Sequence, residues 1–336
     1  MKNLQHAGIG KRIVIYIRFT LLLFSVSSTM IASAAMNMPG VENCARCVLL
    51  IDLSQHRIVM VDLNKQAIVW EWKPSQSNIA AADNKWFINY SDVKPVYENK
   101  YLLISSSAGG VALIRIADKK AVFYSYAGGN THSIELLPDG NIVSASSTGN
   151  YLMLFHVDTL NYPNVYKEKN YLPAAHNLVW DKKRKLLWAA AEDKLYSFTY
   201  NFNCSKPGLM AVDSTSLPDT GAHDLFPVYD KDSLYLTTSN GVYEIDPGSK
   251  KIVAVTGPLI QNIKSISSGP DGFPVLIMKP KVKWWSDEVL NLQGKTIFRL
   301  EGLETYKARW FLPNEFSYNK NERIKSCSHD VAIAKK

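Results

Sequence analysis

The sequence predicts an all-β fold, a six-bladed β-propeller, and three observations lead to this prediction. Strand-sized apolar runs follow one another at intervals of about ten residues. One opening strand recurs along the chain every 38 to 47 residues. The first repeat lacks this opening strand and the last repeat consists of it alone, so the two ends complement each other.

The strand-sized runs are rich in Val, Ile, Leu, Tyr and Phe, and clusters of Gly, Asn, Asp, Pro and Lys separate them. No segment has sustained helical periodicity with capping residues, so a chain with 46% apolar residues is predicted to be built from strands. The clearest predicted strands are Cys47–Asp52, Arg57–Asp62, Ala67–Trp72, Tyr101–Ser106, Val111–Ile116, Ala121–Tyr126, Asn141–Ser147 and Tyr151–Val157.

The repeat is recognised from segments that begin alike. Thr131–Gly140, Ala175–Asp181 and Ala222–Asp230 share a histidine at their second position, and Ile263–Gly272 repeats the Pro-Asp-Gly turn of the first segment. Propeller repeats of the WD40 type span about 40–45 residues and contain four strands, so each unit is predicted to be one blade. Aligning the units on the opening strand makes six residues equivalent: Lys94, His132, His176, His223, Lys264 and Lys307.

The two ends of the repeat region predict how the ring closes. The unit from Cys47 to Lys73 has three strands, and the last opening strand, Tyr306–Pro313, is followed only by a basic tail. Pairing that strand with the N-terminal unit would complete one blade and remove the free edges of an open sheet. This count gives six blades, with seven blades as the alternative.

Most of the net charge of +8 lies at the two ends of the chain. Residues 1–35 contribute +4 and residues 319–336 contribute +3, and subtracting both from the total leaves about +1 for the remainder. A near-neutral body argues against an extended phosphate-binding surface, so no nucleic acid is expected as a partner.

The N-terminal segment has the order of a secretory signal. Bases up to Arg18 precede an apolar run that ends at Ile31, and the small residues of Ala32–Ala34 suit signal peptidase. We therefore predict a signal peptide at 1–35, with an uncleaved anchor as the alternative, a propeller at 36–318 and a basic, flexible tail at 319–336. No later run is long enough to span a bilayer, so the mature protein is expected in the bacterial periplasm or outside the cell.

The four cysteines are Cys44, Cys47, Cys204 and Cys327. In an oxidising compartment they allow three pairings, and the sequence does not choose among them. Cys44 and Cys47 have the spacing of a redox pair, but no βαβ pattern surrounds them. A structural disulfide near the termini is therefore expected.

The opening strands carry the candidate functional residues. The first strand of a propeller blade lines the central channel, and this position holds the six aligned residues, with Arg309 two residues after Lys307 on the same face. Such a ring of cations and imidazoles predicts that the channel mouth binds an anionic small molecule or an acidic glycan. In the alternative interpretation these side chains only form hydrogen bonds with neighbouring blades and water.

Two further roles are considered for His132, His176 and His223. They are candidate ligands of a divalent metal, although neighbouring lysines would oppose a bound cation. They are also candidate catalytic bases, with Lys264 or Arg309 neutralising a substrate carboxylate. The chain has no Gly-rich phosphate loop, Gly-x-Ser-x-Gly elbow, His-Glu-x-x-His motif or EF-hand loop, so no other cofactor or common hydrolase chemistry is indicated.

Several segments resemble motifs of secreted bacterial six-bladed propeller proteins whose function is unassigned. The resemblance covers nearly all of residues 45–315 and implies the fold rather than an activity. A more distant resemblance, in the type of arrangement of His132, His176 and His223, is to propeller polysaccharide lyases acting on oligogalacturonate or ulvan. The segments that carry the main resemblance are Trp70–Trp72, Asp92–Pro95, Ser105–Arg115, His132–Val143 and Tyr306–Trp310.

These observations lead to one expected function and two alternatives. The expected function is that of an exported propeller that binds an anionic ligand at the channel mouth. The alternatives are a lyase-type enzyme that uses the channel histidines, and a structural or partner-docking protein of the cell envelope.

Overall fold

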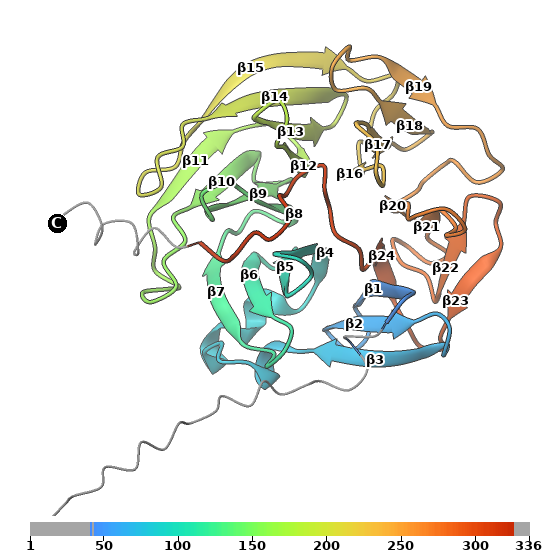
Figure 1. Ribbon diagram of the computed structural model, residues 1–336, viewed down its shortest axis with the longest axis horizontal. Coiled ribbons are helices and arrows are strands. Elements are labelled where there is room, and N and C mark those ends of the chain that lie inside the picture. The colour runs from blue at the N-terminus through green and yellow to red at the C-terminus, as the bar shows by residue number, and fades with distance from the viewer. Residues whose placement is uncertain (1–40, 42–43, 326–336) are drawn as a thin grey trace, which may run out of the picture. The chain divides into compact units, whose positions relative to one another are not determined.

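The computed structural model describes residues 41 and 44–325, and within them the chain forms six four-stranded antiparallel sheets. The sheets stand around a centre as the blades of a propeller (Figure 1). The predicted all-β fold with six blades is confirmed, and the seven-bladed alternative is wrong. The helical segments among the described residues are two short 3₁₀ helices, Pro74–Gln76 and Ala81–Phe87.

Each blade runs from an inner strand at the channel to an outer strand at the rim. Blade 1 contains β24 (Thr305–Trp310), β1 (Cys47–Asp52), β2 (Arg57–Asp62) and β3 (Ala67–Trp72). Blade 2 contains β4 (Tyr90–Val96), β5 (Tyr101–Ser106), β6 (Gly110–Arg115) and β7 (Ala121–Tyr126). Blade 3 contains β8 (Thr131–Leu136), β9 (Ile142–Ser146), β10 (Tyr151–Phe155) and β11 (Lys167–Tyr171).

The second half of the ring repeats the same order. Blade 4 contains β12 (Ala175–Asp181), β13 (Leu186–Ala191), β14 (Lys194–Tyr200) and β15 (Leu209–Ser216). Blade 5 contains β16 (Asp224–Pro227), β17 (Leu234–Thr237), β18 (Val242–Ile245) and β19 (Ile252–Ala254). Blade 6 contains β20 (Ser265–Ser267), β21 (Leu276–Met278), β22 (Glu288–Asn291) and β23 (Thr296–Arg299).

The ring closes as the two ends of the sequence predict. Strand β24 pairs antiparallel with β1, with Arg309 opposite Leu49 and Trp310 opposite Val48. The last strand of the chain therefore supplies the inner strand of the first blade, and the blade formed by both termini is complete.

Turn residues set the ends of the strands. In the turn between β2 and β3, Asp62 Oδ1 accepts hydrogen bonds from the backbone nitrogens of Asn64 at 2.9 Å and Lys65 at 3.3 Å. Such Asx turns end a strand at a defined residue. Five of the eight strands named from the sequence have the observed bounds, and the others differ by one or two residues at an end.

The apolar core lies between the blades. Six clusters of buried residues each join two neighbouring blades, and the cluster between blades 1 and 2 contains Trp72, which is fully buried. The Trp72 ring meets Phe87 and Tyr90 edge to face, with centroids 6.1 Å apart in both cases. Because both faces of a blade pack against neighbours, its strands are apolar on both sides.

After β24 the chain continues as a segment that we call the C-terminal strap, residues 311–325. Figure 1 shows it passing across the centre of the ring towards blades 3 and 4. Lys182 N donates to Phe316 O at 3.4 Å, and Lys325 Nζ donates to Pro138 O at 2.6 Å. Lys182 and Pro138 follow the ends of β12 and β8, so the strap covers the end of the channel where the inner strands finish.

A glycine permits this close passage. Gly140, in the first Pro-Asp-Gly turn, has φ of 92°, and a Cβ atom there would lie 2.7 Å from Lys325 O. The described part of the predicted tail, residues 319–325, thus contacts blades 2 and 3, where Asn321 N also donates to Glu98 at 2.9 Å.

Two expectations concern residues near the termini. Cys44 and Cys47 form a disulfide at the start of β1, and Cys204 is also disulfide-bonded, whereas Cys327 lies outside the described residues. The predicted signal peptide at 1–35 lies outside them too. Within the described part of the chain, no helix is long and apolar enough to cross a membrane.

Candidate functional site

The inner strands present their side chains to the channel at three successive levels. Strand pairing fixes the alignment: Asp92, Ser133, Asn177, Asp224 and Ser265 occupy equivalent places opposite the second strand of their blades. Four inner strands, β4, β8, β12 and β24, have a β-bulge at this place, which turns two consecutive side chains towards the channel. The register of the strands therefore determines which residues belong to each level.

The first level, at the start of the inner strands, is the mouth level, and the other two lie below it. The mouth level consists of Ser91, His132, His176, His223, Lys264 and Tyr306. The middle level consists of Asp92, Ser133, Asn177, Asp224, Ser265 and Lys307, and the deep level of Lys94, Glu135, Val179, Phe226, Ser267 and Arg309.

The structure divides the single ring expected from the sequence among these levels. His132, His176, His223 and Lys264 lie together at the mouth level, but Lys307 lies one level below. Lys94 and Arg309 lie at the deep level. The reason is register: the spacing of the repeats aligns Lys94 with His132, whereas the pairing of the inner strands with their neighbours makes Ser91 its counterpart.

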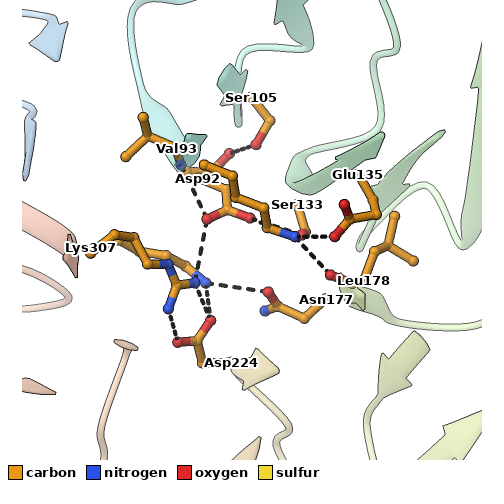
Figure 2. A network of polar contacts seen from close by, with 12 residues as sticks. Asp92, Val93, Ser105, Ser133, Glu135, Asn177, Leu178, Asp224 and Lys307 are labelled. Carbon is orange, nitrogen blue, oxygen red and sulfur yellow. Dashed lines mark hydrogen bonds and ion pairs between the residues drawn. The ribbon is translucent and has the colours of Figure 1, made fainter. Parts of the chain in front are cut away.

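The charged residues of the two lower levels form one buried network (Figure 2). Asp224 accepts hydrogen bonds from Lys307 Nζ at 2.7 Å and from both terminal nitrogens of Arg309 at 2.6 Å. Lys307 Nζ also lies 3.4 Å from Asn177 Oδ1, and the Arg309 guanidinium lies over the Phe226 ring at 4.0 Å. These contacts join blades 1, 4 and 5 across the channel.

The other half of the buried network is built around Lys94. Its Nζ donates to Glu135 Oε2 at 3.0 Å and to Leu178 O at 2.7 Å. Asp92 lies 3.7 Å from Lys94 Nζ and 3.4 Å from Arg309 Nη2, and so connects the two halves. Three carboxylates thus face three cations, and none of the six side chains is more than 2% exposed.

The network keeps its carboxylates ionised. Burial alone would raise the pKa of Asp224, but the charges of Arg309 and Lys307 outweigh burial and hold this pKa well below its usual range. Burial would also raise the pKa of Asp92, and the charges of Lys94, Lys307 and Arg309 lower it instead. The charges of this network are paired with one another, and Arg309 Nε, which has no hydrogen-bond partner among the described residues, is itself buried.

The strap is tied to this network from below. Tyr318, 8% exposed, donates its hydroxyl to Glu135 Oε1, which also accepts from Leu136 N at 3.0 Å. Burial and the charge of Glu135 raise the pKa of Tyr318 well above its usual value, so the phenol stays protonated. The strap therefore covers part of this end of the channel, where it also lines a pocket with Phe226 and Ser267 of the deep level.

The mouth level borders a pocket of about 400 Å³, which we call the mouth pocket. One amine and two imidazoles follow one another at this level. Lys264 Nζ lies 2.5 Å from His223 Nε2, and His223 Nδ1 lies 3.3 Å from His176 Nε2. The His176 and His132 ring centroids are 4.3 Å apart, and His132 Nδ1 lies 2.9 Å from Asn130 O. The pocket is lined by Leu53, Asn89, Tyr90, Ser107, Asn130, His132, His223, Lys264, Trp284 and Tyr306.

The mouth level has one cation and three neutral imidazoles. Burial, together with the charges of nearby lysines, lowers the pKa of His132 to about 4 and that of His223 to about 3. Burial likewise lowers the pKa of His176 well below its usual value. Burial and the charge of Lys307 lower the pKa of Lys264 to about 8, so its amine is mainly protonated at pH 7.

Lys264 differs from the other channel cations in its partners. It is 8% exposed, and within the described residues its side-chain amine contacts the His223 ring rather than a carboxylate. Lys94, Lys307 and Arg309 each face at least one carboxylate. The mouth pocket therefore has an uncompensated positive charge.

The three histidines considered as metal ligands use ring nitrogens in other contacts. His132 Nδ1 is engaged with Asn130 O, and both ring nitrogens of His223 are engaged with other side chains. Over residues 41 and 44–325, no group of three or more His, Cys, Asp or Glu side chains is arranged to hold a metal ion.

Sequence reasoning missed two aromatic side chains of the mouth pocket, Tyr90 and Tyr306. Tyr306 lies at the mouth level of β24, next to Lys307, and the spacing of the repeats selected Lys307 instead. Tyr90 begins β4. Trp284 comes from the loop before β22 and is 53% exposed. Trp86 packs against Tyr124 and Tyr126.

Comparison with known proteins shows the family of this chain. A family model described as a family of unknown function, DUF6528, matches residues 11–326, and the chain belongs to this family. A search of curated proteins finds no match.

Solved structures show the same kind of fold at low sequence identity. A protein of unknown function from Bacteroides caccae is 14% identical, with a TM-score of 0.53 over 80% of this chain and 99% of that chain. A periplasmic gluconolactonase of Pseudomonas aeruginosa is 16% identical, with a TM-score of 0.47 over 65% and 72%. Virginiamycin B lyase from Staphylococcus aureus, bound to quinupristin, is 13% identical, with a TM-score of 0.45 over 75% and 77%. At these identities the first likeness concerns the fold alone.

Proposed function

We propose that this propeller binds a small anionic ligand in the mouth pocket, and that the ligand carries a carboxylate, as an acidic sugar does. The observation that carries the proposal is Lys264, a largely buried cation without a carboxylate partner among the described residues. A buried charge is costly unless it is paired. A ligand carboxylate would supply the missing partner.

The neighbours of Lys264 suit such a ligand. The uncharged imidazoles of His132 and His223 can donate or accept hydrogen bonds without repelling an anion. Tyr90, Tyr306 and Trp284 offer ring surface against which the apolar face of a sugar can pack. A pocket of about 400 Å³ has the size of a small-molecule site.

Direct binding measurements test the proposal. Galacturonate should bind to the purified protein, and its uncharged counterpart galactose should bind more weakly. Lys264→Gln should weaken galacturonate binding about 10- to 100-fold, which corresponds to the loss of one hydrogen bond to a charged group. Lys251→Gln, which removes the same charge at an exposed site beside β19, is the matched control and should bind like the parent protein.

Equal binding of galacturonate by the Lys264→Gln and Lys251→Gln proteins would refute the proposal. If a panel of acidic sugars and small carboxylates neither binds nor raises the melting temperature, the structural or partner-docking alternative replaces it.

The lyase alternative receives less support from the geometry. A general base works best with a pKa near the operating pH, whereas the pKa values of His132 and His223 are lowered to about 4 and 3. Arg309, the candidate for neutralising a substrate carboxylate, is fully buried against Asp224. Formation of an unsaturated product from polygalacturonate or ulvan would reverse this preference.

We also propose that the protein is exported from the cytoplasm. The predicted signal peptide at 1–35 is its support, and acidic glycans are accessible outside the cytoplasm. N-terminal sequencing of the protein recovered from a bacterial periplasm or medium should begin near residue 35 or 36. Recovery of the intact N-terminus in the cytoplasm would refute export.

A further inference from the structure

Lys264 has a property that anion binding does not require. The other two channel lysines, Lys94 and Lys307, face carboxylates at 3.0 and 2.7 Å. Lys264 instead faces His223 Nε2 at 2.5 Å. Its partner is therefore a group that is uncharged at neutral pH.

This contact can be made by either form of the amine. A charged Lys264 donates a hydrogen to His223 Nε2, and His223 then carries its own hydrogen on Nδ1, facing His176. A neutral Lys264 accepts a hydrogen from Nε2, and the Nδ1 lone pair of His223 then faces His176. Because both tautomers of a neutral imidazole are accessible, the geometry does not fix Lys264 as an ammonium.

The surroundings also favour the neutral amine more than water does. Lys264 is 8% exposed and lies one level above Lys307, and no carboxylate occurs among the six mouth-level residues. Burial and the charge of Lys307 lower its pKa to about 8, so a substantial fraction of neutral amine exists near neutral pH. A desolvated lysine next to another cation is the usual form of a nucleophilic lysine.

We propose that Lys264 is a nucleophilic amine that captures a carbonyl group adjacent to the ligand carboxylate, as in a 2-oxo acid, and forms an imine with it. This inference rests on the proposed binding of a carboxylate in the mouth pocket. It adds that the ligand is an oxo acid and that its binding is covalent and reversible.

The reaction balances without any other reagent. The neutral Lys264 nitrogen adds to the carbonyl carbon, a proton passes from nitrogen to the former carbonyl oxygen through water in the pocket, and a carbinolamine results. Loss of hydroxide with a proton, as water, leaves the imine, which takes up one proton to become an iminium. The iminium keeps the positive charge of Lys264 beside the carboxylate, so the pairing that holds the ligand is retained.

Reductive trapping tests the inference. Pyruvate and sodium cyanoborohydride are added to the purified full chain at pH 7.5, and modified lysines are identified by peptide mass spectrometry. Lys264 should be labelled at least about tenfold faster than Lys283, an exposed lysine beside the pocket, because the lowered pKa of Lys264 leaves part of its amine unprotonated at this pH. Acetone, the matched ketone without a carboxylate, should label Lys264 more slowly than pyruvate does.

Each outcome decides between the two claims. If Lys264 is labelled no faster than Lys283, while galacturonate binding still depends on Lys264, the imine is refuted and the proposed function stands. If acetone labels Lys264 as fast as pyruvate, the carboxylate has no part in capture and the oxo-acid assignment fails. If pyruvate does not label Lys264 and no carboxylate binds, both claims fail.

Two controls exclude other causes. Lys264→Arg keeps a cation that cannot form an imine, so its protein should yield no adduct at this position. In urea-unfolded protein the preference for Lys264 should disappear. A preference that persists after unfolding would overturn the inference even if the Lys264→Arg protein fails to fold.

Discussion

The mouth level and the two levels below it are built on the same six inner strands, but they differ in whether their charged side chains are paired. In the buried network, three carboxylates meet three cations at distances of 2.6 to 3.7 Å. At the mouth level there is no carboxylate, the three histidines are uncharged, and Lys264 faces an imidazole. Paired charges fix the geometry of the ring, whereas an unpaired one is available to a ligand.

This difference separates structural from functional candidates. Removing one member of a buried pair leaves a charge that water cannot reach, so the cost falls on stability. Removing Lys264 leaves no opposite charge behind, so the cost should fall on binding. Perturbed groups in a pocket with this pattern are candidates for function rather than for support of the fold.

The largest expected effect is on the buried network. Asp224→Asn keeps the shape of the side chain but leaves Lys307 and Arg309 facing only Asp92 and neutral groups. We expect the free energy of unfolding to fall by about 3–5 kcal/mol, measured by urea titration followed by tryptophan fluorescence. A loss below about 1 kcal/mol would show that the network does not carry the stability assigned to it.

The next effect concerns the pH dependence of the mouth level. The folded pKa of His132, about 4, lies below the usual value of 6.5, so below pH 6.5 the unfolded chain takes up a proton that the folded chain does not. Stability should therefore fall as the pH decreases from about 6.5 to 4, by roughly 3 kcal/mol for this group at about 1.4 kcal/mol per pKa unit. Below about pH 4 the carboxylates of the buried network begin to add their own loss.

The His132→Gln protein tests this assignment. Its unfolding free energy, measured between pH 7.5 and 4.5, should depend less on pH than that of the parent protein. An unchanged dependence would mean that His132 is not the desolvated group described above.

A smaller effect is expected at the end of the channel that the strap partly covers. Tyr318→Phe removes the hydroxyl that donates to Glu135 and leaves that carboxylate with Leu136 N and Lys94. We expect a loss of about 1–2 kcal/mol in thermal or urea unfolding. Ligand binding at the mouth should not change, and a change there would contradict the separation of the two ends.

The smallest effect on stability, together with the largest on binding, is expected for Lys264→Gln. Because the folded pKa of Lys264, about 8, lies below its usual 10.5, charging this amine opposes folding at neutral pH. The substitution should cause no loss of unfolding free energy, because the charge that it removes opposes folding, while anion binding weakens about 10- to 100-fold. In the parent protein, stability should rise with pH between about 8 and 10.5, and this rise should be absent in the variant.

The sequence predicted the architecture because propeller blades are local structures. The bounds of strands such as Cys47–Asp52 follow from residues within and beside them, and the six units follow from turns and histidines that recur once per blade. The closure of the ring by β24 followed from a count of strands at the two ends. Each of these inferences needed only neighbouring residues or the order of units along the chain.

The candidate site was predicted only in part. The sequence selected His132, His176, His223 and Lys264, which do lie together at the mouth level. It placed Lys94, Lys307 and Arg309 in the same ring, because a repeat spacing does not fix the register in which each inner strand pairs within its blade. It gave no sign that the strap covers part of the far end of the channel.

Which cations are paired was decided by the tertiary structure alone. Asp92 and Arg309 are separated by 217 positions in the sequence, and Tyr318 and Glu135 by 183. Such pairs form only when the closing strand and the strap bring the end of the chain across the centre of the ring. The sequence determined which charges the channel contains, and the closure of the ring determined that Lys264 is left without a carboxylate.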